Sequence, residues 1–190
     1  YNFIFEPGTI PLMQALFIES VGQTAFRDVE TPQAGLGEVL IDVQFVGLCG
    51  SDLNTFRGTN PLAGLPRIPG HEIGGTIKAV GPNVPERFQP GASAIVIPYS
   101  TCGTCSACKA GRENACRYNE TLGVQRDGGM SALVALPHDR LILNDTLAPK
   151  HLALVEPLSV GFHAVARGNV SEGETVVVLG GGMIGVGAIL

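Results

Sequence analysis

Four of the five cysteines of this chain lie within 15 residues of one another, and this cluster constrains the fold more than any other feature of the sequence. The cluster consists of Cys102, Cys105, Cys108 and Cys116. Four thiolates at such short spacing can surround one zinc ion in a tetrahedron, and Gly103 and Gly111 give the loop the backbone freedom that it needs. A site closed by four protein ligands leaves no position for substrate, so we expect it to stabilise structure without performing chemistry.

Two alternative interpretations of this cluster are two disulfides or an iron–sulfur cluster. A disulfide between cysteines with only two residues between them is geometrically awkward, and an odd cysteine count argues against a closed disulfide framework. In a ferredoxin-like run the fourth cysteine would lie nearer and a proline would follow it. We therefore predict structural zinc. Because the N-terminus has no basic segment of a secretory signal, we expect a reducing cytoplasm as the compartment.

Up to about Pro149, the chain alternates short strand-like runs with glycine and proline. The runs are residues 13–20, 38–47, 74–81, 93–98 and 131–137. Their composition and turn-forming flanks predict a mostly antiparallel, barrel-like β domain. A short helix is expected over residues 51–57, with Ser51 or Asp52 near its N-cap.

After Pro149 the pattern changes to that of an α/β unit. Residues 151–169 predict a helix or a pair of helices, interrupted around Pro157 and ending near Gly168. Residues 176–179 form a short apolar run typical of a buried parallel strand. A G-x-G-x-x-G motif follows directly, and a strand before it and a helix after it are the context in which this motif binds a dinucleotide.

These patterns divide the chain into three segments. Residues 1–12 are interpreted as an extension, natural or introduced by cloning, because the first strand-like run begins at Met13. Residues 13–155 form the zinc-binding β domain, and residues 156–190 form a linker helix and the first βα unit of a second domain. Because one strand and part of a helix cannot form a sheet, we expect a truncated second domain and no turnover by this chain alone.

Cys49, His71 and Glu156 form a second candidate metal site. A lone cysteine is usually a small buried hydrophobe, and a lone histidine is usually hydrogen-bonded and bland. Together, however, a cysteine, a histidine and a carboxylate suit a catalytic zinc whose fourth position stays open for water or substrate. The other histidines have no partners at metal spacing and are expected to be surface or helix residues; they are His138, His151 and His163.

Five motifs occur in an order that resembles one family. They are GxCGSD, PGHExxG, the four-cysteine loop, a Glu-Pro pair and VVVLGGGMIG, and they extend from residue 13 to the end. The sequence is similar to the zinc-dependent medium-chain dehydrogenases. This resemblance implies a mainly β, GroES-like barrel domain that carries the metal, followed by the start of an α/β Rossmann domain that binds NAD or NADP.

The resemblance also implies roles for individual residues. Cys49, His71 and Glu156 match the catalytic zinc ligands, which gives two zinc ions per chain. A glutamate as third ligand is similar to the sorbitol-dehydrogenase-like branch, as is the stretch around the cysteine loop. Glu72 matches a nearby carboxylate that can exchange with water as a ligand.

Three positions of the predicted helix over residues 51–57 bear on proton transfer. Asp52 resembles a carboxylate that orients the histidine ligand, and Ser51 resembles the hydroxyl that takes the proton of the alcohol. Where most relatives have a histidine that ends the relay, this chain has Asn54, which cannot hold a proton at neutral pH. We expect the proton to leave through water or through Glu72 instead.

The implied cofactor site and reaction follow from the same resemblance. The dinucleotide turn consists of Gly180, Gly182, Met183, Ile184 and Gly185. Zinc lowers the pKa of a bound alcohol, whose carbon then gives a hydride to the nicotinamide. The residue that selects NAD or NADP lies about 20 residues further, beyond Leu190. The expected substrate is a secondary alcohol of a polyol, a sugar acid or a similar small molecule.

Two other functions are compatible with these residues, and several partners are not. The chain could be a zinc-stabilised scaffold without catalysis, or a dehydrogenase of the same fold that acts on a simple alcohol or threonine. A net charge of −5 with scattered Lys and Arg argues against nucleic acid and anionic membranes as partners. No apolar run is long enough to suggest a transmembrane helix. Apolar surface on the second domain predicts a homo-oligomer.

Overall fold

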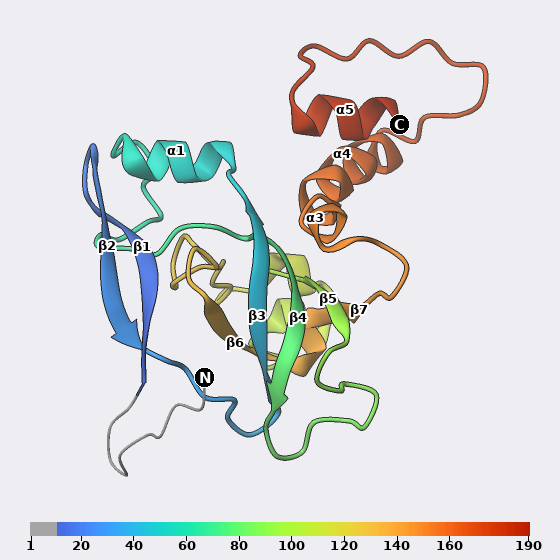
Figure 1. Cartoon of the computed structure of the whole chain (residues 1–190). Coiled ribbons are helices and arrows are strands. Elements are labelled where there is room, and N and C mark those ends of the chain that lie inside the picture. The colour runs from blue at the N-terminus through green and yellow to red at the C-terminus, as the bar shows by residue number, and fades with distance from the viewer. Residues whose placement is uncertain (1–10) are drawn as a thin grey trace.

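The computed structural model describes residues 11–190 and contains two antiparallel β-sheets with a group of helices to one side (Figure 1). Strands β1 (Leu12–Ser20) and β2 (Gln23–Glu30) form a two-stranded hairpin. The five-stranded sheet has the order β6-β3-β4-β5-β7, and all its strand pairs are antiparallel. Its strands are β3 (Glu38–Gly47), β4 (Glu72–Val80), β5 (Ser93–Val96), β6 (Leu133–Pro137) and β7 (Leu141–Leu143).

Helices are short except for one near the C-terminal end. They are α1 (Gly50–Phe56), α2 (Ser106–Lys109), α3 (Pro149–Leu152), α4 (Val155–Arg167) and α5 (Met183–Ile189), with 3₁₀ turns η1 (Glu113–Ala115) and η2 (His138–Arg140). In Figure 1, α3, α4 and α5 are stacked on one another beside the end of the sheet where β3 leads into α1. Among residues 11–190, no helix has the length and apolar character needed to cross a membrane.

The predicted mostly antiparallel β domain is confirmed, and each strand-like run contains a strand. Two strands were not predicted. Strand β2 is exposed along nearly its whole length and so lacks the apolar alternation that marks a half-buried strand. Strand β7 has only three residues. Strand β1 begins at Leu12, inside the predicted extension 1–12, of which residues 1–10 lie outside the described part of the chain.

Alternate residues of the two central strands build the core. Val39 and Ile41 of β3 and Ile73 and Ile77 of β4 are buried in one cluster, because successive side chains of a strand point to opposite faces. Phe88 closes this cluster from the β4–β5 connection. The five-stranded sheet therefore holds the end of β3, which leads into α1, and the start of β4 in fixed relative positions. The candidate metal ligands lie at these two places.

A glycine on β4 lets the first of the C-terminal helices lie directly on the sheet. A Cβ atom at Gly74 would lie 2.8 Å from the amide nitrogen of Ala153 and 2.9 Å from the Cβ of Leu152. Leu152 is fully buried in this contact. Because α4 begins three residues after Leu152, this close approach also fixes where the first turn of α4 stands above β4.

The predicted pair of helices is confirmed, but the interruption lies elsewhere than expected. The break between α3 and α4 falls at Ala153 and Leu154, and Pro157 lies inside the first turn of α4. Proline is tolerated there because the first backbone N–H groups of a helix have no intrahelical acceptor. Helix α4 ends at Arg167 with Gly168 as C-cap, as predicted. The N-cap of α1 is Cys49 and neither Ser51 nor Asp52.

The prediction of a buried strand over residues 176–179 is wrong. This segment pairs with no strand in the described part of the chain, and the side chains of Val177 and Leu179 are 78% and 93% exposed. A parallel strand needs neighbours to satisfy its backbone, and none is provided here. The predicted helix after it does form as α5, which packs on α4 where Gly161 and Gly187 allow the two backbones to approach closely.

Gly74→Ala is expected to destabilise the protein because the added methyl group would overlap the backbone of α3. Overpacking of this kind costs about 1–3 kcal/mol in free energy of unfolding, measured by urea denaturation. Gly64→Ala is the matched control, because a Cβ there meets no atom closer than 3.9 Å. Equal stability of the two variants would contradict the proposed helix–sheet contact.

Candidate metal centres

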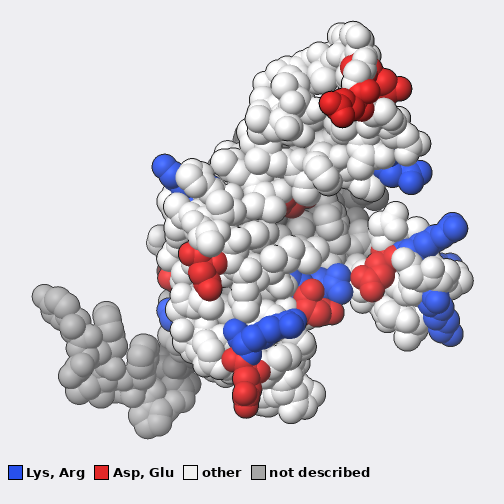
Figure 2. All heavy atoms as spheres, turned by 90° about the vertical axis from the view of Figure 1, so that its right-hand side faces the viewer, with Lys and Arg blue, Asp and Glu red and all other residues white. Residues whose placement is uncertain are grey.

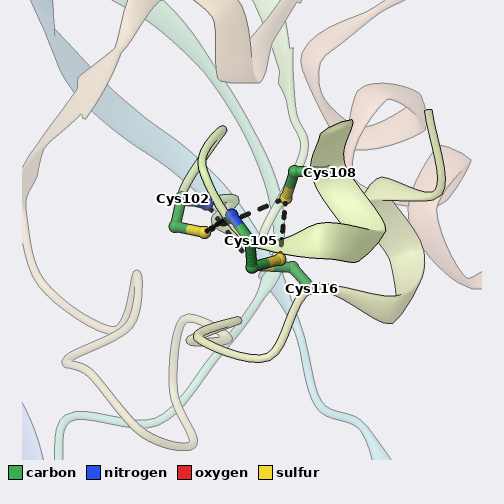
Figure 3. Close-up of side chains that lie close together, drawn as sticks. All are labelled: Cys102, Cys105, Cys108 and Cys116. Carbon is green, nitrogen blue, oxygen red and sulfur yellow. Dashed lines mark hydrogen bonds between the residues drawn. The ribbon is translucent and has the colours of Figure 1, made fainter. Parts of the chain in front are cut away.

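The four clustered cysteines converge on one point in the structure (Figure 3). The Sγ atoms of Cys102 and Cys108 lie 4.0 Å apart, and those of Cys105 and Cys108 lie 3.5 Å apart. A tetrahedron with zinc–sulfur bonds of about 2.3 Å has edges of about 3.8 Å, so these separations match the edges of a single ZnS₄ unit. Helix α2 supplies Cys108, and Cys116 directly follows the η1 turn.

Backbone N–H groups point at the sulfur atoms of this cluster. Cys102 and Tyr118 donate their N–H groups to Cys116 Sγ at 3.4 Å, and Cys105 donates to Cys102 Sγ at 3.3 Å. Hydrogen bonds to the Thr104 backbone and side chain are the main cause that lowers the pKa of Cys102 to about 6. Desolvation and the neighbouring thiols raise the pKa of Cys108 to about 12. A cation bound between the sulfur atoms would offset this effect by stabilising the thiolate form of Cys108.

This geometry separates the three interpretations of the cysteine cluster. All four cysteines are free thiols, and their ligand atoms lie within 4.8 Å of one another. Such a compact set surrounds one ion but leaves no room for a cluster of several irons and sulfides. The loop therefore forms a Cys₄ site of the structural zinc type, as the spacing predicted.

Cys49, His71 and Glu72 form a second group whose ligand atoms lie within 4.8 Å of one another. Cys49 caps the N-terminus of α1 just after β3, and Glu72 is the first residue of β4. Strands β3 and β4 are paired, with Gly47 opposite Glu72, so the sheet itself brings the two segments together. His71 is only 6% exposed.

A buried carboxylate ties these two segments to each other. Asp52 Oδ2 accepts the N–H of Cys49 at 2.9 Å, and Asp52 Oδ1 accepts the N–H of Gly70 at 3.0 Å. Both oxygens are thus engaged by backbone next to a candidate ligand. The resemblance implied that Asp52 orients the ring of His71; the structure adds that its two oxygens accept backbone N–H groups next to Cys49 and His71.

The electrostatics of the second group suit a cation. A hydrogen bond with His71 is the main cause that lowers the pKa of the Cys49 thiol. Burial alone would lower the pKa of His71, but the hydrogen bond with Cys49 and the charge of Asp52 outweigh it and raise that pKa. Burial raises the pKa of Glu72. His71 Nδ1 is buried without a hydrogen-bond partner, and a thiolate, an imidazole and a carboxylate are ligands that zinc accepts.

Glu156 lies beside this group but is held by another residue. It occupies the first turn of α4, is buried, and accepts a hydrogen bond from the Tyr99 hydroxyl at 2.8 Å on Oε1. Its charge contributes to the pKa shifts of both His71 and Glu72, so it faces the same space. The predicted ligands and the nearby Glu72 thus lie around one space. Glu72 belongs to the 4.8 Å group, and Glu156 lies outside it.

Tyr99 is a site residue that no sequence motif indicates. The only signal was its place in the stretch that leads into the cysteine loop. Ser51 behaves differently: it lies two residues after Cys49, and its hydroxyl is buried without a hydrogen-bond partner. Asn54 is exposed on α1 and contributes backbone acceptors to the following loop.

The glycine run and two residues of the second metal group line the same cavity. This cavity of about 440 Å³ is lined by Cys49 and Glu72 and by the glycine turn. All five predicted turn residues line it; they are Gly180, Gly182, Met183, Ile184 and Gly185. Gly180 has φ of +105°, and a Cβ at Gly185 would overlap the carbonyl oxygen of Gly180, so both positions require glycine.

The remaining histidines belong to neither metal group. His151 and His163 are exposed, as predicted. His138 is half-buried: its Nδ1 lies 2.9 Å from the carbonyl oxygen of Gly37, and its ring packs edge-on against Phe88.

Comparison with known proteins gives consistent similarities. The family model for the alcohol dehydrogenase GroES-like domain matches residues 35–146. The chain is 38% identical to L-galactonate-5-dehydrogenase from Escherichia coli K12 and 37% identical to sorbitol dehydrogenase from Bacillus subtilis 168, over 93% and 95% of this chain. A zinc-binding dehydrogenase from Sinorhizobium meliloti 1021, solved with NADP bound, superposes with a TM-score of 0.88 at 36% identity and covers 94% of this chain.

The chain spans about half the length of these proteins. It covers 52% of the L-galactonate-5-dehydrogenase, 53% of the sorbitol dehydrogenase and 52% of the solved S. meliloti chain.

Replacing one cysteine of the Cys₄ site is expected to remove one zinc ion and to lower the melting temperature. Structural zinc contributes several kcal/mol, and each kcal/mol shifts the midpoint of a domain of this size by about 2–4 °C, so Cys105→Ser should lose about 10 °C or more. Zinc content by atomic emission and melting by circular dichroism measure both effects. Cys49→Ser is the control and should retain this ion. Unchanged zinc content in Cys105→Ser would refute the assignment.

Asp52→Asn is expected to loosen the second metal group. An asparagine side chain offers one acceptor oxygen, so its amide would face either the Cys49 or the Gly70 N–H and leave that buried donor unpaired. An unsatisfied donor costs about 1–3 kcal/mol, measurable as a lower free energy of unfolding of the metal-free chain. Asp145→Asn, at an exposed loop position, is the matched control. Equal losses in the two variants would show that the Asp52 bridge contributes nothing specific.

Proposed function

The chain belongs to the zinc-type medium-chain alcohol and polyol dehydrogenase family, and from this membership we propose that it is the metal-binding part of an NAD(P)-dependent oxidoreductase. The proposed reaction is oxidation of a secondary alcohol of a polyol or sugar acid. Similarity to proteins named L-galactonate-5-dehydrogenase and sorbitol dehydrogenase supports this substrate class.

One observation carries the proposal. One cavity of about 440 Å³ is lined both by ligand-type side chains, Cys49 and Glu72, and by the glycine turn. Hydride transfer requires that the alcohol carbon and the nicotinamide meet in one shielded space. A purely structural zinc scaffold would have no need for a dinucleotide turn facing its second metal group.

The residues of this site have distinct proposed tasks. Cys49, His71 and a carboxylate, Glu72 or Glu156, would hold a second zinc ion. When bound, zinc supplies the charge that lowers the pKa of an alcohol, and the nicotinamide supplies the hydride acceptor. Ser51, with its unpartnered hydroxyl, would accept a hydrogen bond from the alcohol and direct its proton away from the reacting carbon.

The proton would then leave by a short route. Asn54 is exposed and its amide holds no proton at neutral pH, so it cannot end a relay. Glu72 lies within the metal group, and burial raises its pKa toward the range in which a carboxyl can take up and release a proton. We assign the exit to Glu72 or to water reached through the same cavity.

Cofactor choice and assembly are further parts of the proposal. The glycine turn would bind the pyrophosphate of NAD or NADP. Exposed apolar side chains on the helices favour self-association: Phe162 of α4 is 74% exposed.

The natural protein that contains this chain is expected to reduce NAD or NADP with a polyol or sugar acid. The test follows absorbance of the reduced cofactor with a panel that includes L-galactonate, sorbitol and simple alcohols. His71→Ala should lower kcat/KM by about 10³-fold or more, because it removes a metal ligand from the reacting centre. His151→Ala, an exposed position outside both metal groups, is the control and should keep full activity.

Two results would contradict the proposal. Binding of only one zinc ion per chain, with Cys49 freely alkylated, would favour the scaffold function. Turnover of ethanol or threonine in preference to every polyol and sugar acid would place the protein on another branch of the family.

A further inference from the structure

The cysteine loop is an excursion from the β domain that leaves and returns through a narrow neck. Residues 98–100 and 120–122 form this neck. Tyr99 and Thr121 form an antiparallel bridge, and Leu122 donates its N–H to the carbonyl oxygen of Pro98 at 3.0 Å. Ser100 N–H donates to the carbonyl oxygen of Glu120 at 3.1 Å. Between these two strands the chain contains all four cysteines of the Cys₄ site (Figure 3).

The Cys₄ site closes the excursion directly above its neck. Cys102 lies three residues after Tyr99, and Cys116 lies five residues before Thr121. Cys102 and Cys116 are in contact through the N–H···S bond of 3.4 Å. An ion bound by both cysteines therefore ties together the two segments of the neck, which are otherwise joined by the backbone hydrogen bonds and by the Ser100 hydroxyl, which accepts the Glu120 N–H at 2.8 Å.

The same neck contacts Glu156, which lies beside the second metal group. The Tyr99 hydroxyl donates to Glu156 Oε1 at 2.8 Å. Glu156 Oε2 has no hydrogen bond from any residue of the described chain, so one carboxylate oxygen is anchored while the other is free. The space-filling view in Figure 2 shows a hollow below the upper part of the molecule, with atoms of Asp or Glu deep inside it.

We propose that Tyr99 is a positioning residue that couples the two metal sites: the ion of the Cys₄ loop fixes Tyr99, and Tyr99 sets where Glu156 stands relative to Cys49 and His71. The proposal rests on the proposed second metal site. It explains why Glu156 lies outside the 4.8 Å group while Glu72 lies within it. The hydrogen bond draws Glu156 toward the neck, so Tyr99 decides how the two carboxylates share the role of third ligand.

The physical basis is the known effect of groups that form hydrogen bonds to a metal ligand on its side away from the metal. A hydrogen bond to a ligating carboxylate fixes its orientation, and loss of such a partner typically lowers metal affinity by about 10–100-fold. Tyr99 is well placed for this task because its backbone is fixed by the Thr121 bridge and its hydroxyl reaches a different element, α4.

The first experiment replaces Tyr99 by phenylalanine, which keeps the ring and removes only the hydroxyl. Metal-free chain is loaded with one equivalent of Zn²⁺ and then titrated with Co²⁺ under anaerobic, reducing conditions, with the thiolate-to-cobalt absorption as readout. Cys49→Ser identifies the band of the second site. Tyr99→Phe should weaken Co²⁺ binding at the Cys49 site by about 10-fold or more and leave the Zn²⁺ affinity of the Cys₄ site unchanged.

Tyr118→Phe is the matched control. Tyr118 lies on the same excursion as the four cysteines, is 61% exposed, and contributes only its backbone N–H to the Cys₄ site. It should bind Co²⁺ as the unaltered chain does. If Tyr99→Phe and Tyr118→Phe bind the second ion equally well, the coupling is refuted although the second site stands. If the unaltered chain binds no second ion, the proposed catalytic metal site itself is overturned, and the coupling with it.

A double-mutant cycle tests whether the Cys₄ ion acts through Tyr99. Cys116→Ser should lower the Co²⁺ affinity of the second site when Tyr99 is present, but should lower it little further in the Tyr99→Phe variant. If the two substitutions acted independently, their losses of binding free energy would add. Additive losses would refute the coupling through this hydroxyl. Because Cys116→Ser can unfold the lobe, circular dichroism accompanies the cycle; the Tyr99→Phe titration decides the proposal if that variant does not fold.

Discussion

The carboxylate of Asp52 accepts one backbone N–H beside Cys49 and another beside His71, and the geometry of the second metal group depends on these two bonds. Cys49 and His71 lie on separate segments at the ends of paired strands. Sheet pairing brings these segments near, but the last few ångströms are set by the shared carboxylate. Since Asp52 is buried and both of its oxygens are used, no water can take over this task without loss.

Close backbone contacts position the other wall of the site. Gly74 lets α3 rest on β4, so α4 starts with Glu156 facing the metal group. Gly161 and Gly187 then let α5 cross α4, and this contact places the glycine turn in the wall of the cavity that Cys49 also lines. The site is therefore assembled by close packing from four segments distant in sequence, and a methyl group added at any of these contacts would move one wall.

The sequence predicted the parts whose chemistry is local. Four cysteines within 15 residues necessarily lie close together in space, so the Cys₄ site followed from spacing alone. The strands followed from their composition, except β2, whose outward side chains carry no apolar alternation, and β7, which has only three residues. Residues 176–179 have the composition of a buried strand, but composition cannot supply the neighbouring strands that burial requires, and here they are exposed. Tyr99 escaped notice because its partner, Glu156, lies 57 residues away.

What the sequence by itself determined is the set of ligand types, the family resemblance and the class of chemistry that cysteine, histidine and carboxylate allow. Tertiary structure decided which of these groups meet. Glu72 joins the 4.8 Å group, Glu156 accepts a hydrogen bond from the Tyr99 hydroxyl, and Asp52 accepts two backbone N–H groups. The reason is physical. Metal and hydrogen-bond contacts depend on separations of a few ångströms between residues far apart in the chain, and those separations are fixed only when the sheet pairs and the helices pack against it.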